Sequence, residues 1–177
     1  MEKLMSGWFM VTLVGADRPG IVAKVASALY EGGANLGEAS MMRLGGNFTI
    51  MLMVRFDGSV KQLHSLLENE AESLGLRLHV DRIEGGLHRH HIPDVRVTVY
   101  GADRAGIVAQ VTSALAEAGL DITDLQSDVG GSETEPLYVM TIEGRAREGI
   151  EALRSALEIV HREGMDVDIE PIETLIG

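Results

Sequence analysis

The strongest constraint on this chain is an internal repeat. The segment 15–29, GADRPGIVAKVASAL, returns almost letter for letter as 101–115, GADRAGIVAQVTSAL, at a constant offset (101 − 15 = 86). The offset is nearly half of the 177-residue chain, so each copy must be a small domain, because a solenoid unit has only about 20 to 50 residues. We therefore predict two related domains, residues 1–86 and 94–177, with a linker at 87–93.

The pattern of apolar residues predicts the same six elements in each copy. Alternating apolar residues indicate half-buried strands, and apolar residues three or four apart indicate helices with one buried face. In the first copy these are the strand 8–14, a helix with its apolar face at Ile21, Val22, Val25 and Leu29, the strands 35–44 and 48–56, a helix ending at Gly75, and the strand 76–83. The order βαββαβ predicts an α+β fold of two tandem ferredoxin-like domains.

The second copy repeats this order with a small gain in length. Its hairpin is expected at 121–129 and 137–143, and its last helix carries Ile150, Leu153, Leu157 and Val160. Gly164 corresponds to Gly75 at a larger offset (164 − 75 = 89). Because insertions are tolerated best in surface loops, we assign the extra residues to the loop before the last helix.

The repeated turn between the first strand and the first helix has the chemistry of an anion site. The fixed φ of Pro19 suits the first helical position, and Asp17 is placed to cap the free amides. The amides of Gly20, Ile21 and Val22 open a helix whose positive end favours a carboxylate. At 35 the chain carries an asparagine, which can both donate and accept hydrogen bonds, so it suits a ligand with a carboxylate and an ammonium group.

A family resemblance rests on these residues. The sequence Val14-Gly15-Ala16-Asp17-Arg18-Pro19-Gly20-Ile21-Val22, followed by Asn35-Leu36, resembles the ACT domain, a βαββαβ module that senses amino acids, and the resemblance returns in the second half. Two such domains at this length are similar to the glycine cleavage system transcriptional repressor family. The resemblance implies ligands near this turn and this strand start, often where two domains meet.

Two sets of ligand-binding residues follow from the turn and the resemblance. The first set is Asp17, Arg18, Pro19, Gly20, Ile21, Asn35 and Leu36, and the possible second set is Asp103, Arg104, Gly106, Ile107, Asp121 and Ile122. The second copy has Ala105 for Pro19 and Asp121 for Asn35. A fixed carboxylate at 121 repels a ligand carboxylate but can hold an ammonium, so we predict that the first site is the better one. The alternative is that both turns are only tight connections.

One face of each predicted sheet has no helix to cover it. The apolar residues predicted on this open face are Met41, Met51, Met53, Leu137 and Val139. An exposed apolar face needs a partner, and methionine adapts to many partners. We expect packing between the two copies, between subunits of a homo-oligomer, or against another protein.

Several classes of function are disfavoured by composition. With 15 Lys and Arg against 27 Asp and Glu, the net charge of −12 repels phosphate backbones. The chain has no cysteine and no apolar run long enough to span a bilayer, so we expect a cytoplasmic protein. The histidines of His88-Arg89-His90-His91 fall in the linker, which disfavours a metal site. We found no nucleophile elbow, Walker loop or HExxH pair and predict no catalytic residues.

The expected function is therefore regulation by a small amino acid without a cofactor. The resemblance implies a repressor of glycine-cleavage genes that binds glycine or a similar effector and acts on a protein partner, such as a transcriptional activator, and not on DNA. Two alternatives remain open: a stand-alone amino-acid sensor for a metabolic enzyme, and an interaction scaffold with vestigial ligand sites.

Overall fold

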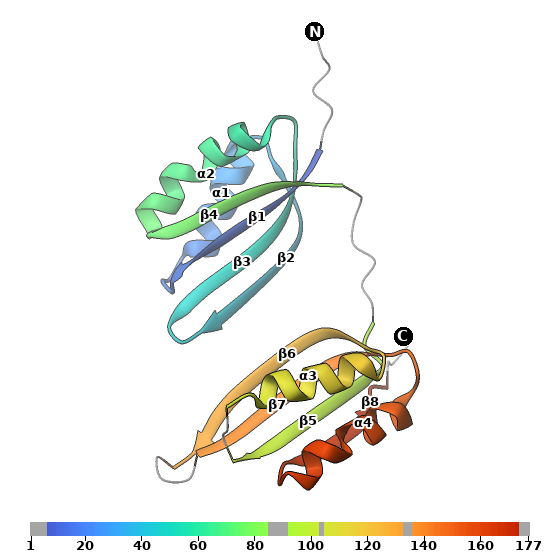
Figure 1. The fold of residues 1–177 in the computed structure, drawn as a ribbon. Coiled ribbons are helices and arrows are strands. Elements are labelled where there is room, and N and C mark those ends of the chain that lie inside the picture. Colours follow the sequence, from blue (N-terminus) through green and yellow to red (C-terminus); the bar gives the residue numbers. More distant parts are fainter. Residues whose placement is uncertain (1–6, 85–91, 103–104, 133–135, 174–177) are drawn as a thin grey trace. The chain divides into compact units, whose positions relative to one another are not determined.

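The computed structural model describes residues 7–84, 92–102, 105–132 and 136–173. The chain divides into two compact units between residues 89 and 90, and each unit is a four-stranded antiparallel sheet with two helices (Figure 1). The predicted α+β architecture is confirmed in both halves. The histidine-rich segment 88–91 lies outside the described residues. Among the described helices, none is long and apolar enough to cross a bilayer.

The first domain follows the predicted order closely. Its elements are β1 (Gly7–Ala16), α1 (Ile21–Glu31), β2 (Asn35–Leu44), β3 (Asn47–Phe56), α2 (Val60–Leu74) and β4 (Leu76–Ile83). The strands are arranged β2-β3-β1-β4, so β2 and β4 form the edges of the sheet. This strand order is that of a ferredoxin-like domain, with both helices packed on one face (Figure 1).

The second domain repeats the arrangement. Its elements are β5 (Val95–Ala102), α3 (Ile107–Glu117), β6 (Leu120–Gly131), β7 (Pro136–Ala146), α4 (Ile150–Arg162) and β8 (Asp166–Pro171). The strand order is β6-β7-β5-β8, the exact counterpart of the first sheet. The duplication seen in the sequence is thus a duplication of one fold.

Each domain has its own apolar core between its sheet and its two helices. Alternate residues of the central strand, Phe9, Val11 and Leu13 in β1, are fully buried, as their period-two spacing predicts. They pack against the apolar stripes of α1 and α2. The second core is formed in the same way by β5, α3 and α4.

The start of α1 differs from the prediction. The helix begins at Ile21, with Gly20 as its N-cap at φ 86°, so Pro19 lies before the helix and not at its first position. No side chain caps the helix: Asp17 bonds to Arg43 instead. Val22, predicted in the core, is 43% exposed. A left-handed N-cap, which glycine adopts without strain, turns the chain sharply into the helix.

A β-bulge shifts the faces of β2. Leu36 pairs with Val54 but Ala39 pairs with Leu52, so two residues of β2 oppose one of β3. This extra residue reverses the alternation along the rest of β2. Met41 consequently pairs with Ile50 on the helix-covered side, and its predicted place on the open face is wrong. The second domain has the matching irregularity between Ile122 and Asp124.

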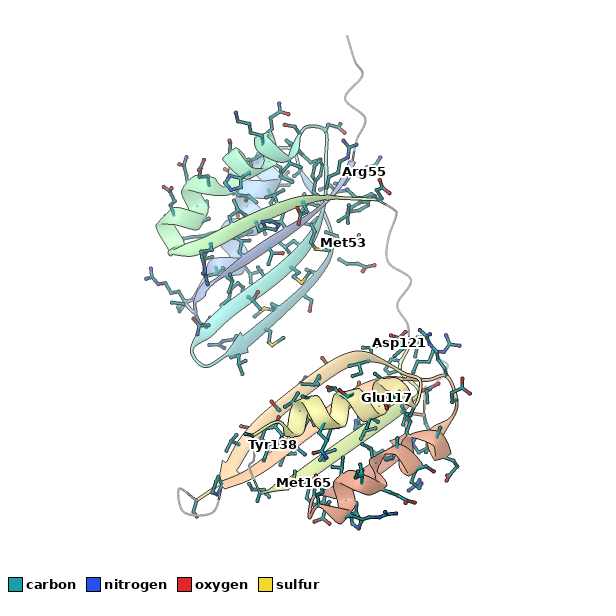
Figure 2. The ribbon with its side chains drawn as sticks, in the orientation of Figure 1. Met53, Arg55, Glu117, Asp121, Tyr138 and Met165 are labelled. Atoms are coloured by element: carbon teal, nitrogen blue, oxygen red, sulfur yellow. The ribbon has the colours of Figure 1, made fainter. Side chains whose placement is uncertain are left out.

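The other residues predicted on the open faces lie on the strands as expected. Met51 and Met53 alternate with the buried residues of β3, and Leu137 and Val139 alternate with those of β7. Met53 is nevertheless only 6% exposed (Figure 2). The ring of Trp8 lies beside it over Gly37, where a Cβ would come within 2.8 Å of the ring.

The extra residues of the second copy lie in its hairpin. Asn35 pairs with Arg55 and Asp121 with Arg145, so the second hairpin is longer by four residues (145 − 121 against 55 − 35). The predicted insertion before the last helix is therefore wrong. Since a hairpin end faces solvent and constrains no core residue, it accepts added length readily.

One buried polar group sets the second core apart from the first. Tyr138 of β7 is 7% exposed, and its hydroxyl has no hydrogen-bond partner among the described residues (Figure 2). The first domain has Phe48 at the same register position. An unpaired buried hydroxyl costs about 1–3 kcal/mol.

We expect Tyr138→Phe to raise the free energy of unfolding by about 1 kcal/mol, because the substitution removes this hydroxyl and keeps the ring. Urea denaturation measures the change. A decrease of the same size would show that the hydroxyl of Tyr138 has a hydrogen-bond partner.

Candidate amino-acid site

The first domain has a cavity of about 530 Å³ at the N-terminus of α1. Its wall combines the turn after β1, the first turn of α1, and strands β2 and β3. The lining residues are Asp17, Arg18, Pro19, Gly20, Ile21, Val22, Ala23, Met41, Arg43 and Phe48. Five of the seven residues predicted for the first site, Asp17 to Ile21, therefore share one cavity. Its volume falls in the range of about 300–1,000 Å³ typical of small-molecule sites.

The helix end at this cavity lacks its usual caps. Gly20 supplies no side chain, and the first turn of α1 has no acidic residue. The same domain caps α2 with side chains: Ser59 accepts from the Gln62 amide at 3.2 Å, and the Gln62 side chain accepts from the Ser59 amide at 2.8 Å. The first amides of a helix have no partner within the helix. The amides of α1 thus remain available for an anion in the cavity.

An ion pair crosses the cavity wall. The Arg43 Nε donates to Asp17 Oδ2 at 2.7 Å, and Arg43 Nη2 donates to the same oxygen. The Asp17 side chain is 22% exposed and that of Arg43 is 68% exposed. Asp17 is also held by its backbone, since its amide donates to the Gly46 carbonyl at 3.0 Å. Because both Arg43 bonds go to Oδ2, Oδ1 can accept another donor.

These groups match the two charges of an amino acid. A ligand carboxylate can accept hydrogen bonds from the helix amides, where the helix dipole also favours negative charge. A ligand ammonium can donate to the carboxylate of Asp17, a residue that also lines the cavity. Apolar contacts come from Val22, Met41 and Phe48.

The structure does not bring Asn35 and Leu36 to this cavity. Asn35 starts β2 and pairs with Arg55, whereas Arg43 lies near the other end of the same strand. Eight residues at about 3.3 Å each separate the two positions by about 25 Å. One small ligand cannot touch both ends within one domain, so a role for Asn35 and Leu36 in binding stays a prediction.

The second domain can be compared with the first at the start of its first helix and at the hairpin position of Arg43. Asp103 and Arg104 lie outside the described residues. Gly106 is again an uncapped N-cap with φ 86°, directly before the buried Ile107. In the register of the hairpin, however, Val129 takes the place of Arg43. Within the described part of the second domain, the hairpin therefore offers no arginine at the position from which Arg43 reaches Asp17 in the first.

Asp121 and Ile122 directly follow Leu120, the first residue of β6, whereas Asn35 and Leu36 are the first two residues of β2. Asp121 lies beside Arg147, with Nη2 to Oδ2 at 3.5 Å, in a depression of about 410 Å³ that Asp94, Arg145 and Ala146 also line. The carboxylate at 121 therefore has a cation near it, which reduces the repulsion expected from sequence.

Sequence reasoning missed the three residues that β2 and β3 contribute to the cavity wall. Arg43, Phe48 and Met41 come from the hairpin, far from the turn in sequence. A signal for Arg43 was present: it is the one charged residue in the segment 39–49. The contact of Arg43 with Asp17 depends on the bulge in β2. No residue pattern in the sequence predicts this bulge.

Comparisons with known proteins agree with the fold of both halves. Family models described as the ACT domain match residues 8–81 and 95–162. A UPF0237 protein of Lactococcus lactis is 37% identical over 83 residues, which are 45% of this chain and 95% of that protein. A UPF0237 protein of Methanopyrus kandleri is 40% identical over 70 residues, 38% of this chain and 78% of that protein.

Two solved structures have the same fold over nearly the whole chain. A protein of Galdieria sulphuraria is 27% identical, with a TM-score of 0.78, over 96% of this chain and 100% of that one. A protein provisionally named a glycine cleavage system transcriptional repressor is 19% identical, with a TM-score of 0.66, over 96% and 99%. The chain belongs to the ACT-domain family, with one ACT domain in each half.

Proposed function

We propose that this protein is an amino-acid-responsive regulator whose effector, glycine or a similarly small amino acid, binds in the first domain at the N-terminus of α1. The observation that carries the proposal is an uncapped helix N-terminus opening into a cavity lined by Asp17 and Arg43. With glycine instead of a capping side chain at this end, the domain forgoes only a few tenths of a kcal/mol, so keeping the amides open for a ligand costs little.

The regulatory part of the proposal rests on the family and on charge. ACT domains in both halves support an effector-controlled protein, and the solved relative provisionally named a glycine cleavage system repressor supports a role in transcription. A net charge of −12 disfavours direct contact with DNA. The effector would shift the protein between states with different affinities for a protein partner, such as a transcriptional activator.

Arg43→Gln tests the cavity directly. The change removes the charge that orients Asp17, and hydrogen bonds to charged groups contribute about 1.5–3 kcal/mol. We expect the affinity for the preferred amino acid to fall about tenfold or more. The measurement is calorimetry after a thermal-shift screen of the twenty amino acids, since a ligand of the native state raises its melting temperature. Arg77→Gln, on β4, is the matched control and should bind normally; no binding by the unmodified protein would refute the proposed sensor.

Asn35→Ala tests whether the effector site includes the start of β2 or only the cavity at α1. Because Asn35 lies about 25 Å along the strand from Arg43, we expect the affinity of the cavity to be unchanged. The same calorimetric titration measures it. A clear loss of affinity would show that the effector site includes Asn35, as predicted from sequence, and would require the two positions to come from different ACT domains.

A further inference from the structure

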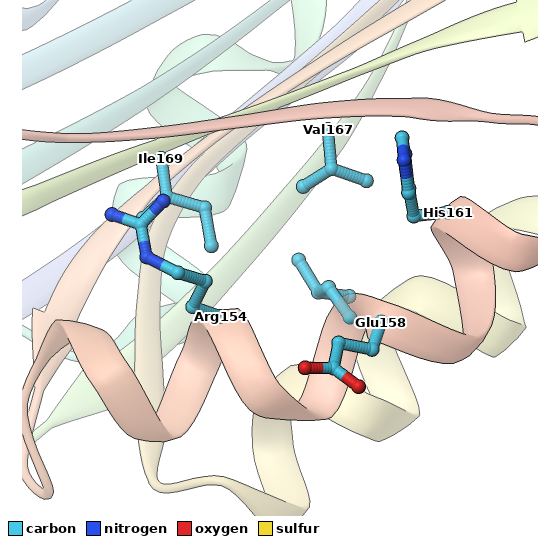
Figure 3. A pocket seen from close by; sticks show the side chains of 6 residues that line it. Arg154, Glu158, His161, Val167 and Ile169 are labelled. Carbon is cyan, nitrogen blue, oxygen red and sulfur yellow. The ribbon is translucent and has the colours of Figure 1, made fainter.

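A groove of about 190 Å³ runs between α4 and the edge strand β8 of the second domain. Its floor is apolar, formed by Leu157, Val167 and Ile169. Arg154 and His161 flank it along α4, while Val167 and Ile169 descend toward the helix from β8 (Figure 3). The His161 ring is fixed, because Nδ1 donates to the Met165 carbonyl at 3.1 Å. The groove is small and suits single aliphatic side chains.

Among the described strands, none pairs with the outer side of β8. There β8 pairs with β5 alone and forms one edge of the sheet. The Ile172 amide donates to the Asp94 carbonyl at 2.9 Å, and hydrogen bonding alternates along an antiparallel ladder. Asp166, Asp168 and Glu170 therefore bond to β5. The amides and carbonyls of Val167 and Ile169 point to the open edge, directly above the groove that their side chains line.

The opposite face of β8 is acidic. Asp166, Asp168 and Glu170 alternate with the two groove residues and are all exposed. Arg96 donates to Glu170 at 3.0 Å and to Glu143 at 2.8 Å. These hydrogen bonds, the Glu143 bond foremost, raise the pKa of Arg96 above its ordinary value. No ion pair to Asp166 or Asp168 is found within the described part of the domain, so their charge is uncompensated.

The corresponding edge of the first domain differs in charge. There β4 carries Arg77, His79 and Asp81 on its open face, and His79 bonds to Asp81 at 2.7 Å. The last turns of α2 carry no histidine, whereas the last turn of α4 carries His161. Unpaired acids along the free edge are thus a feature of β8 and not of β4.

We propose that the β8 edge is the docking site for an extended segment of a partner protein in which basic and apolar side chains alternate. The segment adds one strand to the sheet through the backbone groups of Val167 and Ile169. Successive side chains of a strand point to opposite faces, so its apolar residues enter the groove and its basic residues face Asp166 and Asp168. The inference specifies the partner surface of the proposed regulator and does not depend on effector binding.

The first test uses a fluorescent eight-residue peptide that alternates lysine and valine, with the full-length protein. We expect saturable binding by fluorescence anisotropy, at least tenfold tighter than that of a peptide with four lysines followed by four valines. Hydrogen exchange of the Val167 and Ile169 amides should slow in the complex. Equal binding of both peptides, or unchanged exchange at these amides, would overturn the proposal.

Three variants locate the peptide on the protein. Asp168→Lys should weaken binding at least tenfold, whereas Asp128→Lys, on the same sheet face but on the far strand β6, should change it less than twofold. Val167→Pro removes an amide that points to the open edge, where proline is tolerated, and should weaken binding while the melting temperature is retained. Equal effects of the two lysine variants would refute the site. The thermal shift caused by amino acids, measured on the same samples, reports on the effector site separately. The docking site and the effector site can therefore be refuted independently of each other.

Discussion

Val22→Glu is expected to abolish effector binding to the first domain while making that domain more stable. Val22 lies in the first turn of α1, is 43% exposed and lines the cavity. A carboxylate at this position satisfies the free amides and interacts favourably with the helix dipole, by about 0.3–1 kcal/mol. The same charge then occupies the place of the effector's carboxylate.

The loss of affinity should be large, because two carboxylates compete for one helix end. At about 4 Å in a partly solvated site, like charges repel by roughly 4 kcal/mol. We expect the affinity to fall at least about 100-fold in calorimetry. Chemical denaturation should show a slightly higher free energy of unfolding in the same variant.

The duplication supplies a matched control. Val108 is the residue after Ile107 as Val22 is the residue after Ile21, and it is 39% exposed. Val108→Glu should stabilise α3 similarly without affecting effector binding in the first domain. If Val22→Glu binds the effector normally, the carboxylate does not sit at the N-terminus of α1, and the proposed site is wrong.

The elements themselves could be read from the sequence because the apolar pattern and the glycines agree. Fully buried alternation in β1, the glycine after α2 and the two glycines of the first hairpin each mark a feature that the structure contains. Repetition in a second copy added independent support. Features set by local chemistry were thus predictable over almost the whole chain.

What could not be predicted depends on register and on competition between partners. One extra residue at the β2 bulge moves Met41 to the helix side and brings Arg43 to Asp17. Once Asp17 bonds to Arg43, it no longer caps α1, and Gly20 takes the N-cap in a left-handed conformation. The cavity is therefore the joint result of a turn that the sequence reveals and a strand register that it does not.

Removal of a core leucine should destabilise only the domain that contains it. Leu157 of α4 is 1% exposed and Leu67 of α2 is fully buried, and each belongs to a cluster made of residues from its own half of the chain. Truncation of a buried leucine to alanine costs about 2–5 kcal/mol, since apolar contacts are lost and a cavity remains. That is a large fraction of the stability of a small domain.

Leu157→Ala and Leu67→Ala therefore form a matched pair. Hydrogen exchange should quicken in β5 and β7 for the first variant and in β1 and β3 for the second, with the other sheet unchanged. Leu157 also forms the floor of the α4–β8 groove, so Leu157→Ala should weaken the alternating peptide, whereas Leu67→Ala should leave it bound. Faster exchange in both sheets from either variant would show that the two ACT domains unfold as one unit. If the cores unfold independently, a loss of stability in one core leaves exchange in the other sheet unchanged.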